Sequence, residues 1–246
     1  MDVTSILFMA LLFGVAAALY SSVGHGGASA YLAIMALFSV APEVMKPTAL
    51  ALNLLVAGLG TWRYARRGLI NCRLLAAFAL TAAPAAYLGG GIDVPAEYYR
   101  PLVGVLLWLA ALRLMWHPKQ LAERETRPPS LAISLPTGAI LGLLAGLTGT
   151  GGGIFLSPLI ILLRWEEPRR TSGVAAAFIL LNSAAGLLGN LQSVRAVPSE
   201  VPFFLVAVAA GAVLGTWLGV ERLPRPWLLR SLAAVLMIAG AKLLLA

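Results

Sequence analysis

The sequence predicts an all-α polytopic membrane protein built from two inverted repeats, and three observations carry this prediction. The 246 residues are 60% hydrophobic and only 11% charged, whereas soluble domains carry about 25% charged residues. Uncharged stretches such as 3–20, 74–92 and 201–220 are long enough to cross a hydrocarbon core of about 30 Å. Finally, a glycine-rich break in a long apolar run occurs twice, once in each half of the chain.

Ten apolar segments follow one another along the chain. They fall at roughly 3–22, 28–41, 47–63, 74–92, 99–116, 130–148, 153–164, 171–194, 200–220 and 226–245. The second and seventh are too short for a straight crossing, and each follows one of the glycine-rich breaks. We therefore expect about 8–10 membrane helices, with broken or re-entrant helices at the two breaks.

The two halves of the chain resemble each other in the order of their motifs. The matches are Gly24-His25-Gly26-Gly27 with Gly149-Thr150-Gly151-Gly152, Lys46-Pro47-Thr48 with Arg169-Arg170-Thr171, Leu52-Asn53 with Leu181-Asn182, and Gly60 with Gly189. We predict a first membrane repeat over 1–116, a cytoplasmic linker over 117–129 and a second membrane repeat over 130–246. Five segments per repeat is an odd number, so the two copies would cross the membrane in opposite directions.

The basic residues predict which side of the membrane holds the chain ends. If the amino terminus lies outside, all of the 18 Lys and Arg residues except Lys46, Arg100, Arg195 and Lys242 fall in inside loops. The opposite orientation would leave only those four inside. Since cytoplasmic loops are enriched in Lys and Arg, we expect both termini to lie outside. The net charge of +8 then reflects loop orientation and attraction to anionic lipid, and does not indicate a nucleic-acid partner.

The polar groups inside the apolar segments favour a negative or neutral cargo. All ten Asp and Glu residues lie in or beside predicted loops. Proton pumps usually carry an intramembrane carboxylate or histidine, and cation pathways need a negative lining. The interior instead offers glycine N–H groups, hydroxyls, amides and His25. We therefore expect a small anionic substrate, or else a neutral polar solute.

Other kinds of site are not indicated. A lone cysteine, Cys72, and two histidines give neither a disulfide framework nor a metal site, and no cofactor is expected. The glycine breaks lack the preceding strand and the following Lys-Ser or Lys-Thr of a phosphate-binding loop. No nucleophile and base pair occurs in the apolar segments, so we predict no catalytic residues and no enzyme.

The candidate substrate site lies at the two breaks. A helix that restarts after a break has unpartnered N–H groups and a partial positive charge, which together favour an anion. The predicted substrate-binding residues are Ser22, Gly24, His25, Gly26, Gly27, Ala28, Asn53, Thr148, Thr150, Gly151, Gly152, Gly153 and Asn182. Three alternatives stay open: His25 could be a neutral residue that fixes its loop, the hydroxyls could bond to the helix backbone, and the amides could join helices.

The chain resembles the TauE/SafE family of sulfite exporters, also called the TSUP family. The resemblance rests on Gly24-His25-Gly26-Gly27, Gly149-Thr150-Gly151-Gly152-Gly153 with Ser157-Pro158, and Thr171-Ser172 with Leu181-Asn182-Ser183 and Gly189. His25 and Ala28 depart from the Thr150 and Gly153 of the second half, and Ala33 stands where the second half has Pro158. The resemblance implies transport of small sulfur-containing anions, such as sulfite, thiosulfate, sulfoacetate and related sulfonates, or of organic acids, across the bacterial inner membrane.

Paired helix interruptions in inverted repeats are typical of a secondary transporter that works by alternating access around a midplane site. A passive anion channel or facilitator is the alternative, since no interior carboxylate marks an ion-coupling site. Coupling to protons or sodium, and a homo-oligomeric assembly in membrane lipid, are both compatible with the sequence.

Overall fold

The computed structural model describes residues 3–22, 25–115, 126–191, 200–218, 233, 236–238 and 240–245. These residues form helices and connecting loops, with no strand among them. The helices are α1 (Val3–Ser22), α2 (Ala28–Leu37), α3 (Pro42–Arg66), α4 (Cys72–Gly91), α5 (Ala96–Met115), α6 (Leu131–Thr148), α7 (Gly153–Leu162), α8 (Pro168–Gly189) and α9 (Val201–Leu218). The all-α prediction is confirmed. Gly24, most of the predicted linker 117–129 and much of the predicted segment 226–245 lie outside the described residues.

Several of the predicted segment boundaries were wrong. The eighth segment was expected at 171–194, but α8 runs from Pro168 to Gly189. We expected the third segment to begin at residue 47, but α3 begins at Pro42, which occupies the first helical position where its missing N–H costs nothing. The second segment was expected to reach residue 41, but α2 ends at Leu37 because the chain turns sharply through Ser39, which has φ of 57°.

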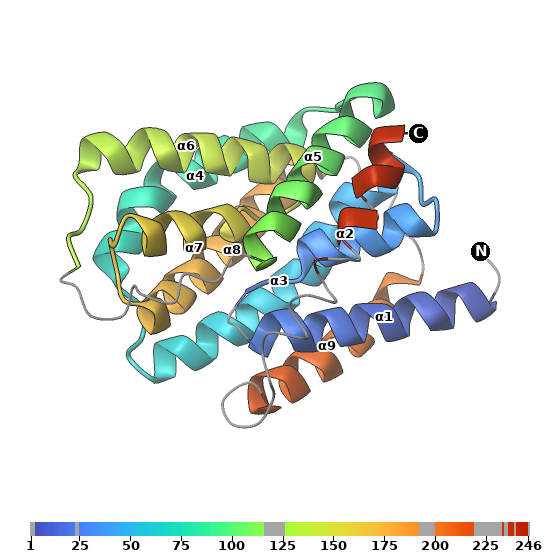
Figure 1. Ribbon diagram of the computed structural model, residues 1–246, viewed down its shortest axis with the longest axis horizontal. Helices are drawn as coiled ribbons and strands as arrows, with labels where there is room; N and C mark the ends of the chain where they lie inside the picture. Colours follow the sequence, from blue (N-terminus) through green and yellow to red (C-terminus); the bar gives the residue numbers. More distant parts are fainter. Residues whose placement is uncertain are drawn as a thin grey trace.

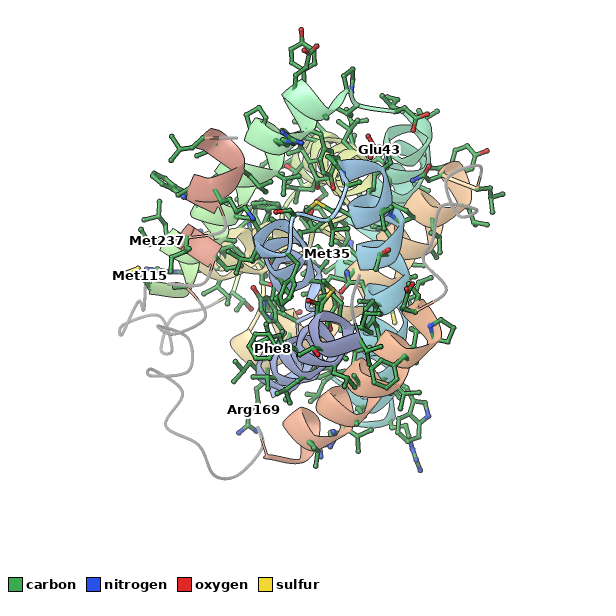
Figure 2. All side chains as sticks on the ribbon, turned by 90° about the vertical axis from the view of Figure 1, so that its right-hand side faces the viewer. Phe8, Met35, Glu43, Met115, Arg169 and Met237 are labelled. Carbon is green, nitrogen blue, oxygen red and sulfur yellow. The ribbon has the colours of Figure 1, made fainter. Side chains whose placement is uncertain are left out.

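The protein is a multi-pass membrane protein. Within the described residues, five helices are long and apolar enough to cross a membrane, at residues 3–21, 42–66, 72–91, 131–148 and 169–189. Large apolar side chains cover much of the outer surface, as lipid contact requires: Phe8 is 54% exposed, while Met35 at the centre of Figure 2 is buried. The start of α1 and the helical residues 240–245 lie at the same end of the molecule (Figure 1).

The two short helices, α2 and α7, are too short to span a hydrocarbon core by themselves. Each has 10 residues, about 15 Å, or half of the hydrocarbon core. The end of α2 shares a cavity with Ile6 near the start of α1. In the same way the end of α7 meets the chain just before α6, where the N–H of Arg127 donates to the carbonyl of Arg164 over 2.8 Å. In each of the pairs α1–α2 and α6–α7, the short helix therefore folds back beside the long helix before it (Figure 1).

The ends of α2 and α7 have the same hydrogen-bonded turn, 125 residues apart. The N–H of Val40 donates to the carbonyl of Met35 over 3.0 Å, and the N–H of Trp165 donates to that of Ile160 over 2.9 Å. The residues before them, Ser39 and Arg164, have φ of 57° and 56°. They are the two non-glycine residues with positive φ in the described chain. This is a left-handed helix cap of the Schellman kind.

The most extensive contacts between helices are those of α4 with α6 and of α1 with α9 (Figure 1). Small residues let the backbones touch. Gly138, Gly142 and Gly146 of α6 face the carbonyls of Phe78, Ala82 and Ala86 on α4, and Gly211 and Gly215 of α9 face those of Gly14 and Ala18 on α1. Small residues at such crossings are what allow close packing between membrane helices.

Gly142→Ala is expected to lower the free energy of unfolding by about 1–3 kcal/mol, because a Cβ there would overlap the backbone of Ala82. The matched control is Gly58→Ala, whose Cβ would lie 3.9 Å from the nearest atom, Cδ1 of Leu180. This control is expected to be neutral or to gain up to about 1 kcal/mol from helix propensity. Thermal unfolding in detergent measures both, and equal stability of the two variants would contradict the close crossing.

Candidate functional site

The two glycine breaks meet on the side chains of α3 and α8. A Cβ at Gly26 would overlap the amide oxygen of Asn53, and a Cβ at Gly151 would overlap the amide nitrogen of the same residue. Ile179 closes the other side, since a Cβ at either glycine would lie 3.0 Å from its Cγ2 atom. The structure therefore brings together two loops that are 125 residues apart in the chain.

The meeting point lies at half the depth of the helix bundle. Asn53 is the twelfth of the 25 residues of α3, and Ile179 is the twelfth of the 22 residues of α8. Asn53 is fully buried, and its Nδ2 donates to Oγ of Ser183 over 3.2 Å. Its Oδ1 has no hydrogen-bond partner. A buried, unpartnered amide oxygen costs free energy. Because this oxygen can only accept, it needs a donor, and of this amide only Nδ2 can donate to an anion.

Both short helices restart directly after their breaks, as predicted. Gly27 precedes α2 and Gly152 precedes α7, and neither helix start has a side-chain cap. The first N–H groups of each helix have no intrahelical partner and carry the positive end of the helix dipole. Two such ends at one place favour an anion.

The two breaks differ in backbone conformation. Gly149, Gly151 and Gly152 all have positive φ, between 74° and 80°, whereas Gly26 and Gly27 do not. Positive φ favours glycine because it lacks a Cβ. The second break thus requires glycine because of its positive φ angles. At Gly26 glycine is required because a Cβ would overlap Asn53.

Tyr31 is a polar residue of this region that the sequence reasoning missed. Its ring folds back over Gly27, where any Cβ would overlap the ring and the hydroxyl, as long side chains on helices point toward the N-terminus. Tyr31 is fully buried, and its hydroxyl has no hydrogen-bond partner. An O–H donor is therefore placed at the start of α2. Ile179 was also missed, and Ser183 was noted only as part of the Leu181-Asn182-Ser183 motif, because nothing local assigns a site role to a serine or an isoleucine in an apolar helix.

The threonines of the second break are bonded within the protein. Oγ1 of Thr148 donates to the carbonyl of Leu144 over 2.6 Å. It lies 3.0 Å from Oγ1 of Thr150, which must then be the donor of that pair. The predicted alternative for Thr148, bonding to its own helix, is what the structure shows. Tyr99 secures the same turn by donating to the carbonyl of Thr148 over 3.0 Å.

The residue of α8 that lies with Asn53 at the breaks is Ile179, since Gly26 and Gly151 each face both of them. Gly60 faces Ala176, and Gly186 faces Leu50. The pairing of Asn53 with Asn182 stays a prediction. Asn182 is fully buried, with both amide atoms unpartnered.

The other predicted residues lie at the first break. Ser22 ends α1, and Ala28 begins α2 and is buried. His25 is partly exposed, and its backbone N–H donates to the carbonyl of Tyr20 over 3.0 Å, which closes the loop. Gly153 is buried at the start of α7, and a Cβ there would overlap Ile179.

Lys46 connects the second break to the end of α4. This lysine is buried, and its ammonium donates to the carbonyls of Gly90 over 3.0 Å and Ile92 over 2.9 Å. A cation suits the C-terminal end of a helix, where carbonyls lack partners. The backbone of Lys46 lies beside Gly149, where a Cβ would be 3.0 Å from its carbonyl oxygen. Lys46 therefore fixes the loop and the helix end together.

Comparison with known proteins places this architecture in a family. The profile of the TauE/SafE sulfite exporter family matches residues 9–243. A probable membrane transporter protein of Sinorhizobium fredii, y4hK, is 38% identical over 98% of this chain and 99% of its own length. The probable membrane transporter protein YjnA of Bacillus subtilis is 26% identical over the same shares. No solved structure matches the chain significantly. The chain is a membrane transporter protein and belongs to the TauE/SafE sulfite exporter family.

Proposed function

We propose that this transporter moves a small sulfur-containing anion, such as sulfite, thiosulfate, sulfoacetate or a similar sulfonate, or an organic acid, across the bacterial inner membrane by alternating access. The anion would bind between the two breaks. The observation that carries the proposal is the convergence of Gly26 and Gly151 on the buried amide of Asn53.

The chemistry at this point fits a compact oxyanion. The starts of α2 and α7 supply N–H donors, and the unpartnered hydroxyl of Tyr31 adds an O–H donor. Hydrogen bonds to a charged group are worth about 1.5–3 kcal/mol each, so a few of them offset the loss of hydration. Of the described acidic residues, those within helices lie in the first turns of α3 and α5, far from this point along the chain. No negative charge of the described helix interiors therefore opposes the anion.

The matched features of the two halves support an inverted repeat. The α2 and α7 hairpin ends share one turn geometry, and the α4–α6 pairing corresponds to the α9–α1 pairing. A pair of re-entrant hairpins that enter from opposite ends and meet at half depth is the arrangement expected of alternating access. We propose that both chain ends lie outside, on the periplasmic side, and that the two halves rock about the breaks.

The test begins with ligand-induced stability. Purified protein in detergent is heated with sulfite, thiosulfate, sulfoacetate, sulfate or acetate, at concentrations up to about 100 times the dissociation constant, where stabilisation reaches about 2.7 kcal/mol. We expect one class of anion to raise the unfolding temperature, and the same class to be carried into proteoliposomes. Absence of stabilisation by every anion would overturn the proposed cargo.

A passive anion channel is distinguished by the flux experiment. Under an imposed proton or sodium gradient, a coupled transporter accumulates the anion above its external concentration. A channel only dissipates the anion gradient, whichever ion gradient is imposed. Accumulation therefore supports the proposal, and its consistent absence under both gradients would favour the channel.

A further inference from the structure

The two ends of the molecule differ at corresponding places. Where α2 ends, a cavity of about 370 Å³ lies between the start of α1, the loop after α2, the start of α3 and the start of α9. Its lining includes Val40, Thr48, Phe204 and Met35, which is labelled in Figure 2, and Glu200 adds a carboxylate to the lining. The hydroxyl of Thr48 is buried and has no hydrogen-bond partner. This end of the molecule is open.

Where α7 ends, the corresponding space is filled. Trp165 is only 8% exposed and packs against Phe78 of α4, with ring centroids 5.7 Å apart. Both belong to a buried apolar cluster with Leu156, Ile160, Val174 and Phe178. Dense aromatic packing of this kind excludes water and small solutes. Among the residues that the structure describes, the place that corresponds to the cavity is therefore closed.

The filled and empty places correspond residue by residue. Val40 and Trp165 each complete the same turn after a short helix. Thr48 and Val174 are each the seventh residue of helices that begin with proline, α3 and α8. Phe204 and Phe78 each precede by eleven residues a glycine, Gly215 or Gly89, that faces a carbonyl of the paired helix. The difference between the ends is thus a difference at Val40 and Trp165, not a different fold.

A polar latch also holds the closed end. The carboxylate of Glu166 accepts from Nδ2 of Asn71 at the start of α4, and from the N–H of Glu167 over 3.0 Å. Oδ1 of Asn71 caps α4 by accepting from the N–H of Leu74 over 3.1 Å. The loop after α7 is therefore tied to α4 by hydrogen bonds as well as by Trp165. At the open end, Ala41 offers no side chain for such a bond.

Packed rings separate the open cavity from the first break. Thr48 lies five residues before Asn53 on α3, about 7.5 Å along the helix axis and about 140° around it, so the two side chains point to different sides of α3. A chain of rings connects the cavity wall to the first break: Phe204 contacts Phe13 edge-on with centroids 5.1 Å apart, and Phe13 contacts Tyr31 edge-on at 5.3 Å. A movement of α9 at Phe204 would therefore displace Phe13 and, through it, Tyr31, whose ring covers Gly27.

The geometry points to a two-gate device in which the cavity at Val40 and Phe204 is an open vestibule, separated from the first break by the rings of Phe13 and Tyr31, and Trp165 on Phe78, latched by Glu166 and Asn71, is the closed gate at the other end. The inference rests on the proposed function, because opening one end while closing the other is what alternating access requires. In the opposite state Trp165 leaves Phe78, and the loop after α2 closes on α9.

The test measures thiol labelling without any substrate, so it does not depend on the identity of the cargo. The sole cysteine, Cys72, is exposed and is first replaced by serine. Thr48→Cys and Val174→Cys are then introduced singly, and their rates of reaction with a membrane-impermeant methanethiosulfonate are compared. Since Thr48 borders the cavity and Val174 lies in the packed cluster, we expect the first to react about tenfold faster.

Exchanging the residues at the two gates should exchange the two rates. Trp165→Val is expected to raise labelling at Val174→Cys about tenfold, and Val40→Trp to lower labelling at Thr48→Cys by a similar factor. Glu166→Ala, which keeps the tryptophan and removes the latch, should act in the same direction as Trp165→Val. Trp62→Val, at a tryptophan that is 56% exposed, is the control and should change neither rate.

Equal labelling of the two positions before any gate substitution, or unchanged rates after both exchanges in folded protein, would overturn the inference. Thermal unfolding of each variant establishes that it is folded. If gating is observed but no anion alters stability or is transported, the two-gate device stands and the proposed cargo fails.

Discussion

Alanine at Gly26 or Gly151 is expected to reduce anion transport by about 10–100-fold. In both variants the new Cβ would overlap the amide of Asn53 and push it from its place between the breaks. The loss of a hydrogen bond to a charged ligand is worth about 1.5–3 kcal/mol, which corresponds to this range of affinity. Uptake into proteoliposomes at several substrate concentrations measures the effect.

The chain provides controls that separate the two costs of adding a Cβ. Gly68 has φ of 63° but no atom within 4 Å of a Cβ, so Gly68→Ala carries only the left-handed strain of about 1–2 kcal/mol. Gly26→Ala carries the collision without positive φ, Gly151→Ala carries both, and Gly58→Ala carries neither. We expect transport to fall in the two variants whose Cβ overlaps Asn53, Gly26→Ala and Gly151→Ala. We expect stability to fall wherever there is either an overlap or left-handed strain. Transport that fell equally in Gly68→Ala and Gly26→Ala would contradict a substrate site at Asn53.

Leucine at Asn53 or Asn182 is expected to leave a folded protein that no longer responds to the anion. Asn182→Leu removes two buried, unpartnered amide atoms and should raise the stability of the ligand-free protein by about 1–3 kcal/mol. Asn53→Leu removes one unpartnered oxygen and one hydrogen bond to Ser183, so its stability should change by less than about 1.5 kcal/mol. Thermal unfolding with and without anion measures both effects.

The opposite outcome would identify these amides as connections between helices. In that case each leucine variant would lose stability, while the anion would still stabilise it as it does the unmodified protein. Asn190→Leu is the matched control, because Asn190 is buried with an unpartnered Nδ2 at the end of α8. It should change stability without changing the response to the anion.

The apolar pattern alone was enough to predict the helices and their order. Transfer of a segment into lipid depends on its own composition, so α1, α4 and α9 follow from uncharged stretches that a reader can mark along the chain. The breaks at Gly26 and Gly151 could also be predicted, because clustered glycines in an apolar run favour a turn in the backbone. The residues that these breaks contact could not be predicted from the sequence.

The details of the candidate site come from contacts between distant parts of the chain. Ile179 and Ser183 look like ordinary helix residues, and only packing brings them to Gly151. Lys46 was expected to mark a loop, but it is buried because the end of α4 supplies carbonyl partners. Tyr31 depends on the direction in which its side chain folds back over Gly27. None of these positions follows from residue type.

By itself, the sequence determined that this protein spans a membrane through many helices, that two glycine breaks recur in its halves, and which family it resembles. These are properties of segments, and the hydrophobic cost of each segment is local. Only the tertiary structure decided that both breaks meet on Asn53 and Ile179, that a cavity lies beside Val40, and that Trp165 packs on Phe78. Those features depend on which helix faces which, and close packing resolves that only when the whole chain is assembled.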